Sequence, residues 1–240
     1  MSPILTDRSF TFKDIFTMSW GLFTTHFTAI ATITLIVYIP INIILFFIPV
    51  EPDFAGFRVY FRVIQLFELF IGILATMATA YLVQQAIDGK EIQPKEAFVK
   101  AISRWGASVG THILMSIFLV GLLILLVVPA IVFYVYWIFV SFVIVLKDKT
   151  GNEALRYSKQ LVTGQWWRVT GYALVLGVLA LLASFVVGIF HFFVPIHIVT
   201  SVLVDTSIDI VISFFIVAWT VFFLHVDRVK ISEEKELLGE

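Results

Sequence analysis

Six long apolar segments fill most of this chain and constrain its fold more than any other feature. Each is close to the roughly 20 residues that a helix needs to cross the hydrocarbon core of a bilayer. The chain is 60% hydrophobic and 14% charged, whereas soluble domains average about 45–50% and about 25%. The sequence therefore predicts an all-α, polytopic integral membrane protein, with one six-span domain over residues 1–230. The expected spans cover residues 26–50, 59–84, 107–127, 129–146, 169–193 and 198–226.

The Lys and Arg residues lie almost entirely on one side of these spans. With the N-terminus placed in the cytoplasm, 14 of the 16 fall in the N-terminal segment, the second-to-third and fourth-to-fifth connections, and the tail. Only Arg58 and Arg62 fall on the other side. Because cationic loops stay in the cytoplasm, we expect a protein of the inner or plasma membrane with both termini cytoplasmic. The acidic, polar residues 231–240 are expected to form a solvated tail.

Spans three and four meet at Val128-Pro129. Proline lacks the N–H that helical hydrogen bonding needs, so the helix is expected to break there. One long kinked segment is the alternative, but about 40 residues are too many for a single crossing. The sequence therefore predicts a tight hairpin between these two spans.

Three short amphipathic helices are expected in the cytoplasmic connections, lying in the membrane interface. Thr11 is expected to cap the first, with Asp14 three residues on, Pro94 to open the second, and Asn152 to cap the third. Each leads directly into a span, which suggests a threefold internal repeat of helix, span, turn and span. Chance resemblance between amphipathic segments explains the same pattern.

The stretch from Val127 to Leu176 combines a proline before an aromatic span, a charged turn with glycine, and an Ala-Leu-x-x-Ser helix. It resembles the membrane domain associated with glycerophosphoryl diester phosphodiesterases and related uncharacterised six-span bacterial membrane families. This resemblance implies a six-span helical fold and no agreed activity. No segment of this sequence is long and polar enough to be the phosphodiesterase domain, so the catalytic residues of that domain are not carried over. The matching residues are Pro129, Gly151, Ala154, Leu155, Ser158, Gly164 and Trp167, with the chain's exit from its last span at His225-Val226-Asp227-Arg228.

Polar side chains at membrane depth form one candidate site. Arg62, Gln65 and Glu68 lie on span two, and Asp205 and Asp209 lie four residues apart on span six. Ionisable groups in a membrane are costly and usually face a bundle interior or a water-filled cavity. The cluster is therefore either a polar vestibule for a solute, ion or lipid headgroup, or a structural ion pair in which Arg62 binds Asp205 or Asp209.

A dense group of cations in the fourth-to-fifth connection forms the second candidate site. Such a group attracts anionic lipid headgroups by about 1 kcal/mol for each cation near the surface. Retention of the loop in the cytoplasm explains the same cations, and the two interpretations are compatible. The expected headgroup-binding residues are Lys147, Lys149, Arg156, Lys159 and Arg168.

The sequence assigns no catalytic residue, metal or cofactor. His191 and His197, with Asp205, have the ligand types of a zinc site but no metal-binding spacing, so histidines of an interfacial loop are the preferred interpretation. Ser158 lacks a nucleophile-elbow pattern and is interpreted as a packing or capping residue. The chain has no cysteine and a net charge of −1, which gives no sign of nucleic-acid binding.

Three functions remain open, and membrane lipids are the expected partners. The preferred one is a non-enzymatic protein that handles lipid or passes a small solute through a helical bundle. The second is an intramembrane, lipid-active enzyme that uses Glu68, Asp205 and Asp209 with His191 or His197. The third is a structural or accessory subunit, as a homo-oligomer or with a protein partner, in which the polar residues serve only packing.

Overall fold

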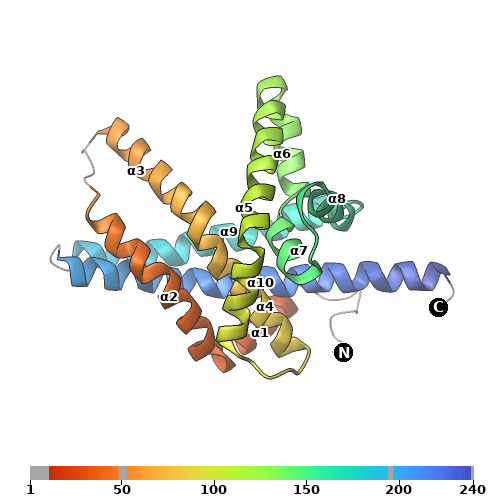
Figure 1. Ribbon diagram of the computed structural model, residues 1–240, viewed down its shortest axis with the longest axis horizontal. Coiled ribbons are helices and arrows are strands. Elements are labelled where there is room, and N and C mark those ends of the chain that lie inside the picture. The colour runs from red at the N-terminus through yellow and green to blue at the C-terminus, as the bar shows by residue number, and fades with distance from the viewer. Residues whose placement is uncertain (1–10, 49–52, 194–196, 239–240) are drawn as a thin grey trace.

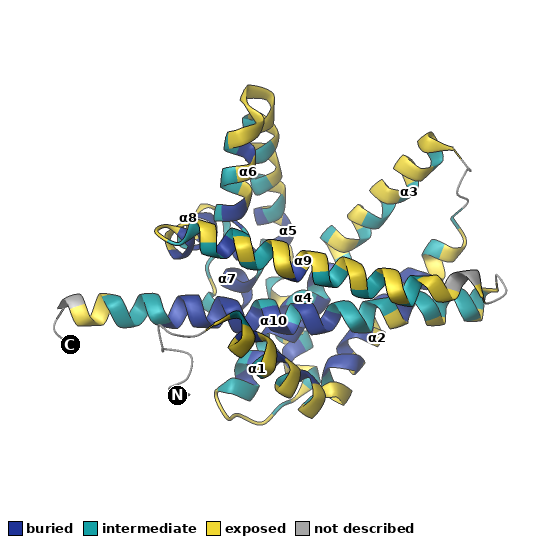
Figure 2. Ribbon diagram, turned by 180° about the vertical axis from the view of Figure 1, so that it is seen from behind, coloured by how far each residue is buried: buried dark blue, intermediate teal, exposed yellow. Residues whose placement is uncertain are grey.

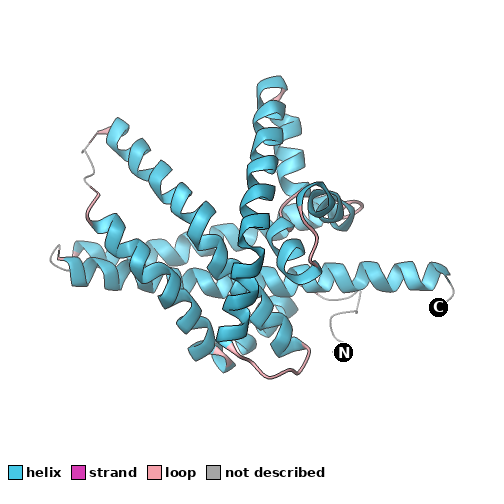
Figure 3. Ribbon diagram, in the orientation of Figure 1, coloured by secondary structure: helices cyan, strands magenta, loops and turns pink. Residues whose placement is uncertain are grey.

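The computed structural model describes residues 11–48, 53–193 and 197–238, and these residues form helices joined by short connections, with no strand among them (Figure 3). Six helices in this part of the chain are long and apolar enough to cross a membrane, which confirms the predicted all-α polytopic class. Figure 1 labels the main elements. They are α1 (Phe12–Thr25), α2 (Phe27–Phe46), α3 (Phe54–Phe67), a π-helical segment (Glu68–Gly72), α4 (Ile73–Ile87), α5 (Pro94–Leu125), α6 (Val127–Tyr136), α7 (Val140–Lys147), α8 (Gly151–Val162), α9 (Trp166–Gly188), a 3-10 turn (Ile189–Phe192) and α10 (Ile198–Leu238).

Two of the helices are longer than the sequence predicts. The segment that opens at Pro94 runs without a break into the third span, because its buried Ala97 and Ala101 already face the core and nothing interrupts the helix before Leu125. Helix α10 has 41 residues, or about 60 Å at 1.5 Å per residue. It is thus about twice as long as a bilayer core is thick, and it continues to Leu238, into the residues expected as a solvated polar tail.

The hairpin predicted between spans three and four is present, and its two helices are separated by a single non-helical residue. Leu126 is extended (φ −160°, ψ 136°) and separates α5 from α6. Pro129 follows in the first turn of α6, where a missing N–H breaks no hydrogen bond. The two helices stand together as one projecting pair (Figure 1).

Two of the predicted amphipathic segments form separate helices, α1 and α8, and side-chain hydrogen bonds mark where each helix begins. Thr11 and Asp14 form the predicted capping box of α1: the Thr11 N–H donates to Asp14 Oδ2 at 2.8 Å, and the Asp14 N–H donates to Thr11 Oγ1 at 3.4 Å. The prediction that Asn152 caps α8 is wrong. Thr150 holds the cap position, and the Gly151 N–H is bound instead by Thr111 Oγ1 of α5 at 2.8 Å.

Helix α10 is the central element of the fold. It packs against α1, α2, α4 and α9, and residues 220–228 are buried throughout (Figure 2). The α5–α6 pair and α3 extend away from it, and both carry largely exposed apolar side chains (Figure 2). Because apolar surface of this extent suits lipid rather than water, these helices are shaped for a bilayer.

Candidate functional site

The first candidate site is a cavity of about 160 Å³ between α2, α3, the π-helical segment and α10. Three carboxylates face it, and none of its lining residues is Lys, Arg or His. We call it the acidic cavity. Its lining residues are Tyr38, Ile41, Asn42, Leu45, Tyr60, Ile64, Phe67, Glu68, Asp205, Ile208 and Asp209.

The π-helical segment positions Glu68. A π-helix is rare and is frequently found at functional sites, and this one runs from Glu68 to Gly72. The Glu68 carboxylate folds back over Gly72: a Cβ at position 72 would lie only 2.1 Å from Glu68 Oε2. Glycine is therefore required for this placement of the carboxylate. The Phe70 carbonyl in the same segment accepts a hydrogen bond from Trp105 Nε1 of α5.

Two buried side chains of α2 fix the carboxylates of the other helices. The Tyr38 hydroxyl donates to Glu68 Oε2 at 3.1 Å. Asn42 Nδ2 donates to Asp209 Oδ2 at 2.8 Å and to Thr206 Oγ1 at 3.2 Å. Burial without a partner would be costly for these polar groups, so the contacts also hold α2 against α10 and the π-helical segment.

The structure brings together only part of the predicted polar cluster. Glu68, Asp205 and Asp209 line the acidic cavity, whereas Arg62 and Gln65 are exposed and do not. All five lie in the described part of the chain, and no ion pair there joins Arg62 to Asp205 or Asp209. The predicted pairing is therefore not found: Arg62 lies on an exposed part of α3, away from the residues that line the cavity.

Sequence reasoning missed the α2 contribution and Thr206. Tyr38 and Asn42 lie four residues apart, which places them on one helix face. They are polar residues within an apolar span, so the same criterion that selected Glu68 and Asp209 would have found them.

The second candidate site is an apolar groove of about 410 Å³ bounded by α5, α6 and α8. Its walls are aromatic and aliphatic, and its two charged side chains and its one side-chain amide come from α8. We call it the α8 groove. Its lining residues are Phe118, Leu122, Phe133, Trp137, Asn152, Leu155, Arg156 and Lys159.

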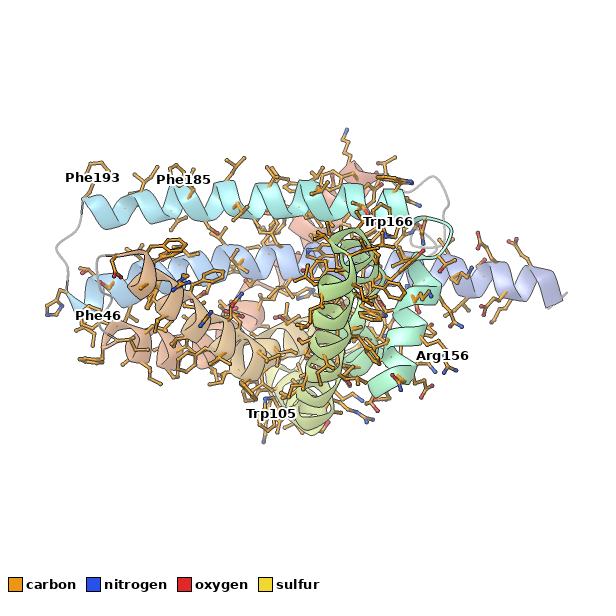
Figure 4. The ribbon with its side chains drawn as sticks, turned by 90° about the horizontal axis from the view of Figure 1, so that it is seen from above. Phe46, Trp105, Arg156, Trp166, Phe185 and Phe193 are labelled. Atoms are coloured by element: carbon orange, nitrogen blue, oxygen red, sulfur yellow. The ribbon has the colours of Figure 1, made fainter. Side chains whose placement is uncertain are left out.

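The two cations of the α8 groove differ in their surroundings. Lys159 Nζ lies 5.1 Å from the centre of the Phe133 ring and 5.5 Å from that of Tyr136, close enough for cation–π attraction. Arg156 is exposed on α8, at the opposite end of the molecule from Phe46 (Figure 4). Neither cation has a carboxylate partner among the described residues.

The other three predicted headgroup-binding cations are engaged within the protein. Lys147 forms an ion pair of 2.5 Å with the buried Asp227, and Lys149 one of 2.5 Å with Glu153. Arg168 lies 3.3 Å from His225 Nε2. The predicted five-residue cluster is therefore divided: Arg156 and Lys159 line the α8 groove, whereas Arg168 lines a separate pocket with Lys230 and Glu233.

Helix α8 is anchored firmly beneath the groove. Ser158 accepts from the Phe139 N–H at 3.3 Å and donates to the Tyr136 carbonyl at 2.8 Å, which satisfies the backbone where α6 ends and α7 begins. This agrees with its interpretation as a capping residue. The Tyr157 hydroxyl donates to Asp227 Oδ1 at 2.6 Å. Burial and this bond to a carboxylate raise the pKa of Tyr157 above its ordinary value.

The histidines expected near the last turn have local roles where they are described. His197 precedes α10, and its Nδ1 accepts from the Val199 N–H at 3.3 Å. The side chain of His191 and the residue Pro195 lie outside the part that is described. Among the described residues, no group of three or more His, Asp or Glu side chains is placed to hold a metal ion.

Comparison with known families gives one match. The profile of a family described as a domain of unknown function (DUF7847) matches residues 63–226. No curated protein and no solved structure matches the chain. An uncharacterised family is consistent with the sequence prediction, whereas the narrower resemblance to the phosphodiesterase membrane domain stays a prediction. The matched region contains every lining residue of the α8 groove but not Tyr38, Asn42 or Tyr60 of the acidic cavity.

Proposed function

Because the chain belongs to the DUF7847 family, whose description gives no activity, we propose a function from its own residues. The protein is a non-enzymatic, lipid-handling membrane protein that binds an anionic lipid in the α8 groove. The observation that carries this proposal is the groove itself: apolar walls from α5 and α6 meet two cations of α8 that no carboxylate neutralises in the described structure.

The geometry matches the two parts of a lipid. The hydrocarbon chain lies along Phe118, Leu122 and Phe133, and the headgroup lies at Arg156 and Lys159. Lipid tails are as apolar as the groove, so moving a hydrocarbon chain from the bilayer into the groove gains little free energy. The apolar walls therefore contribute a fit to the shape of the chain. The cations therefore supply most of the preference for one lipid over another, at about 1 kcal/mol each near the surface. The predicted orientation places α8 on the cytoplasmic side.

A second candidate function is favoured by the acidic cavity. Three carboxylates and no cationic side chain line it, so it suits a small positively charged solute. Uptake of a permeant cation into liposomes, compared between the wild type and Asp209→Asn, tests this function. Equal uptake by the two proteins would remove it. The enzymatic and accessory-subunit hypotheses stay predictions.

Native mass spectrometry of the gently solubilised full chain tests lipid binding. Wild type is expected to retain an anionic lipid, and the double variant Arg156→Gln/Lys159→Gln to lose it. Lys149→Gln is the matched control, because it removes a neighbouring cation that is paired with Glu153 and does not line the groove. Equal lipid retention by the double variant and the wild type would show that these cations bind no lipid.

A further inference from the structure

We propose that the α8 groove selects lipids whose headgroup is a phosphate monoester, an inference that rests on the proposed lipid-binding function. A lipid of this class carries its phosphate at the end of the headgroup, with no amine, sugar or further alcohol attached. The lipid is thus defined by two features: a compact headgroup and a charge close to −2.

The spacing of the polar groups on α8 favours a single compact headgroup. Arg156 and Lys159 are three residues apart, and Asn152 is four residues before Arg156. Residues at these spacings are neighbours on one helix face, with Cβ atoms about 5–6 Å apart. Two cations and an amide N–H₂ therefore converge on one region of the groove, and the three oxygens of a terminal phosphate offer acceptors to all of them.

Three carboxylates near α8 are already bound by other cations. Glu153 pairs with Lys149, Asp227 with Lys147, and Asp148 with both Lys100 and Arg104. The two groove cations thus have no neutralising partner within the described protein. A phosphate monoester carries about −1.5 to −2 charges at pH 7, because its second pKa is near 6. A phosphodiester headgroup carries only one negative charge and neutralises half of this pair.

The lining residues also disfavour amine-bearing headgroups. No carboxylate lines the groove, so an ethanolamine, choline or serine ammonium group finds no partner for its positive charge there. The remaining lining is aromatic and aliphatic: Phe118, Leu122, Phe133, Trp137 and Leu155. Such a surface accepts a hydrocarbon chain and leaves a bulky polar headgroup unsatisfied.

Lipid titration of the delipidated full chain in detergent, followed by native mass spectrometry, tests the inference. The probes are phosphatidic acid, phosphatidylglycerol and phosphatidylethanolamine with identical chains, and inorganic phosphate as a competitor. We expect phosphatidic acid to bind about fivefold more tightly than phosphatidylglycerol, which is the value of one additional charge interaction near the surface. The preference is expected to shrink as the pH falls below about 6, where the second phosphate charge is lost.

The variants separate the two levels of the proposal. In Arg156→Gln and Lys159→Gln, tested singly and together, the preference for phosphatidic acid should disappear, whereas Lys149→Gln should keep it. Equal binding of the two anionic lipids, lost in the double variant, would overturn monoester selectivity and leave the lipid site intact. If the double variant binds both lipids as tightly as the wild type does, the proposed function is overturned as well. Displacement of phosphatidic acid by inorganic phosphate at similar concentration would show that the site recognises free phosphate rather than lipid.

Discussion

Trp105 of α5 donates its indole N–H to the backbone carbonyl of Phe70, inside the π-helical segment of the second span. A π-helix departs from the i→i−4 hydrogen-bonding pattern, and such irregularities persist only where neighbouring groups satisfy the displaced backbone. This contact therefore joins the start of the third span to the segment that positions Glu68.

Trp105→Phe should loosen the π-helical segment. The phenyl ring preserves most of the packing but donates no hydrogen bond, so the Phe70 carbonyl loses its partner, at a cost of about 1 kcal/mol. We expect faster amide hydrogen exchange at residues 68–74 of the protein in nanodiscs. Trp167→Phe is the control, because Trp167 is exposed. Unchanged exchange in Trp105→Phe would show that the contact does not stabilise the segment.

Gly72→Ala should displace the Glu68 carboxylate without unfolding the chain. The new Cβ would lie 2.1 Å from Glu68 Oε2, which is the far end of a flexible side chain and can move. Loss of the bond from Tyr38 is expected to change the rate at which a hydrophobic carbodiimide labels Glu68, measured by peptide mass spectrometry. Gly110→Ala, whose Cβ meets nothing within 4 Å, should label like wild type. Identical labelling of all three proteins would contradict the tight placement of Glu68 over Gly72.

Lys147→Met should destabilise the protein strongly. The side chain of Asp227 is only 2% exposed, and its ion pair with Lys147 measures 2.5 Å. Removing one partner leaves a buried charge that, within the described part of the chain, only Tyr157 still contacts, at a cost of about 3 kcal/mol. The loss of stability is measured as a fall in the midpoint of thermal unfolding in detergent. Lys149→Met breaks the exposed pair with Glu153, for which we expect at most about 1 kcal/mol. Equal losses in the two variants would mean that burial of Asp227 does not matter.

Acidification should weaken the junction between α5 and the loop after α7. Asp148 accepts from Lys100 Nζ at 2.6 Å, and this bond with the nearby Arg104 holds the pKa of Asp148 below its ordinary value. The stabilisation is therefore complete above the ordinary aspartate value of about 4 and is lost as the pH falls through the lowered one.

Asp148→Asn isolates that charge effect. Asp148 has a left-handed backbone with φ 56°, a conformation that asparagine also adopts readily, so the substitution adds little strain. The variant should show a smaller fall in unfolding midpoint between about pH 6 and about pH 3 than the wild type. An equal fall in both proteins would assign the acid sensitivity to other groups.

The membrane architecture was largely predictable because bilayer thickness dictates the length of apolar segments. The six spans, the α1 capping box of Thr11 and Asp14, and the break near Pro129 all depend on local chemistry that a sequence displays. The threefold repeat and the side on which the termini lie stay predictions.

The irregular features were not predictable from local patterns. The π-helical segment at Glu68–Gly72 accepts a hydrogen bond from Trp105, a residue of another span. Likewise, Asn42 binds Asp209 across 167 positions of the chain, a meeting that only packing decides. The start of α8 at Gly151 depends on Thr111 of α5, which is why a plausible local cap at Asn152 misled the prediction. In each case a distant partner outweighed the local sequence.

The unbroken helix α10 carries Asp209 of the acidic cavity and Asp227 of the α8 junction on one rod. Their eighteen-residue separation corresponds to about 27 Å along the helix axis. A long helix curves gently but does not kink sharply without a proline, a bulge or a similar interruption, so the two carboxylates belong to one continuous element. A rigid-body tilt of α10 would therefore move the acidic cavity and the anchor of α8 together.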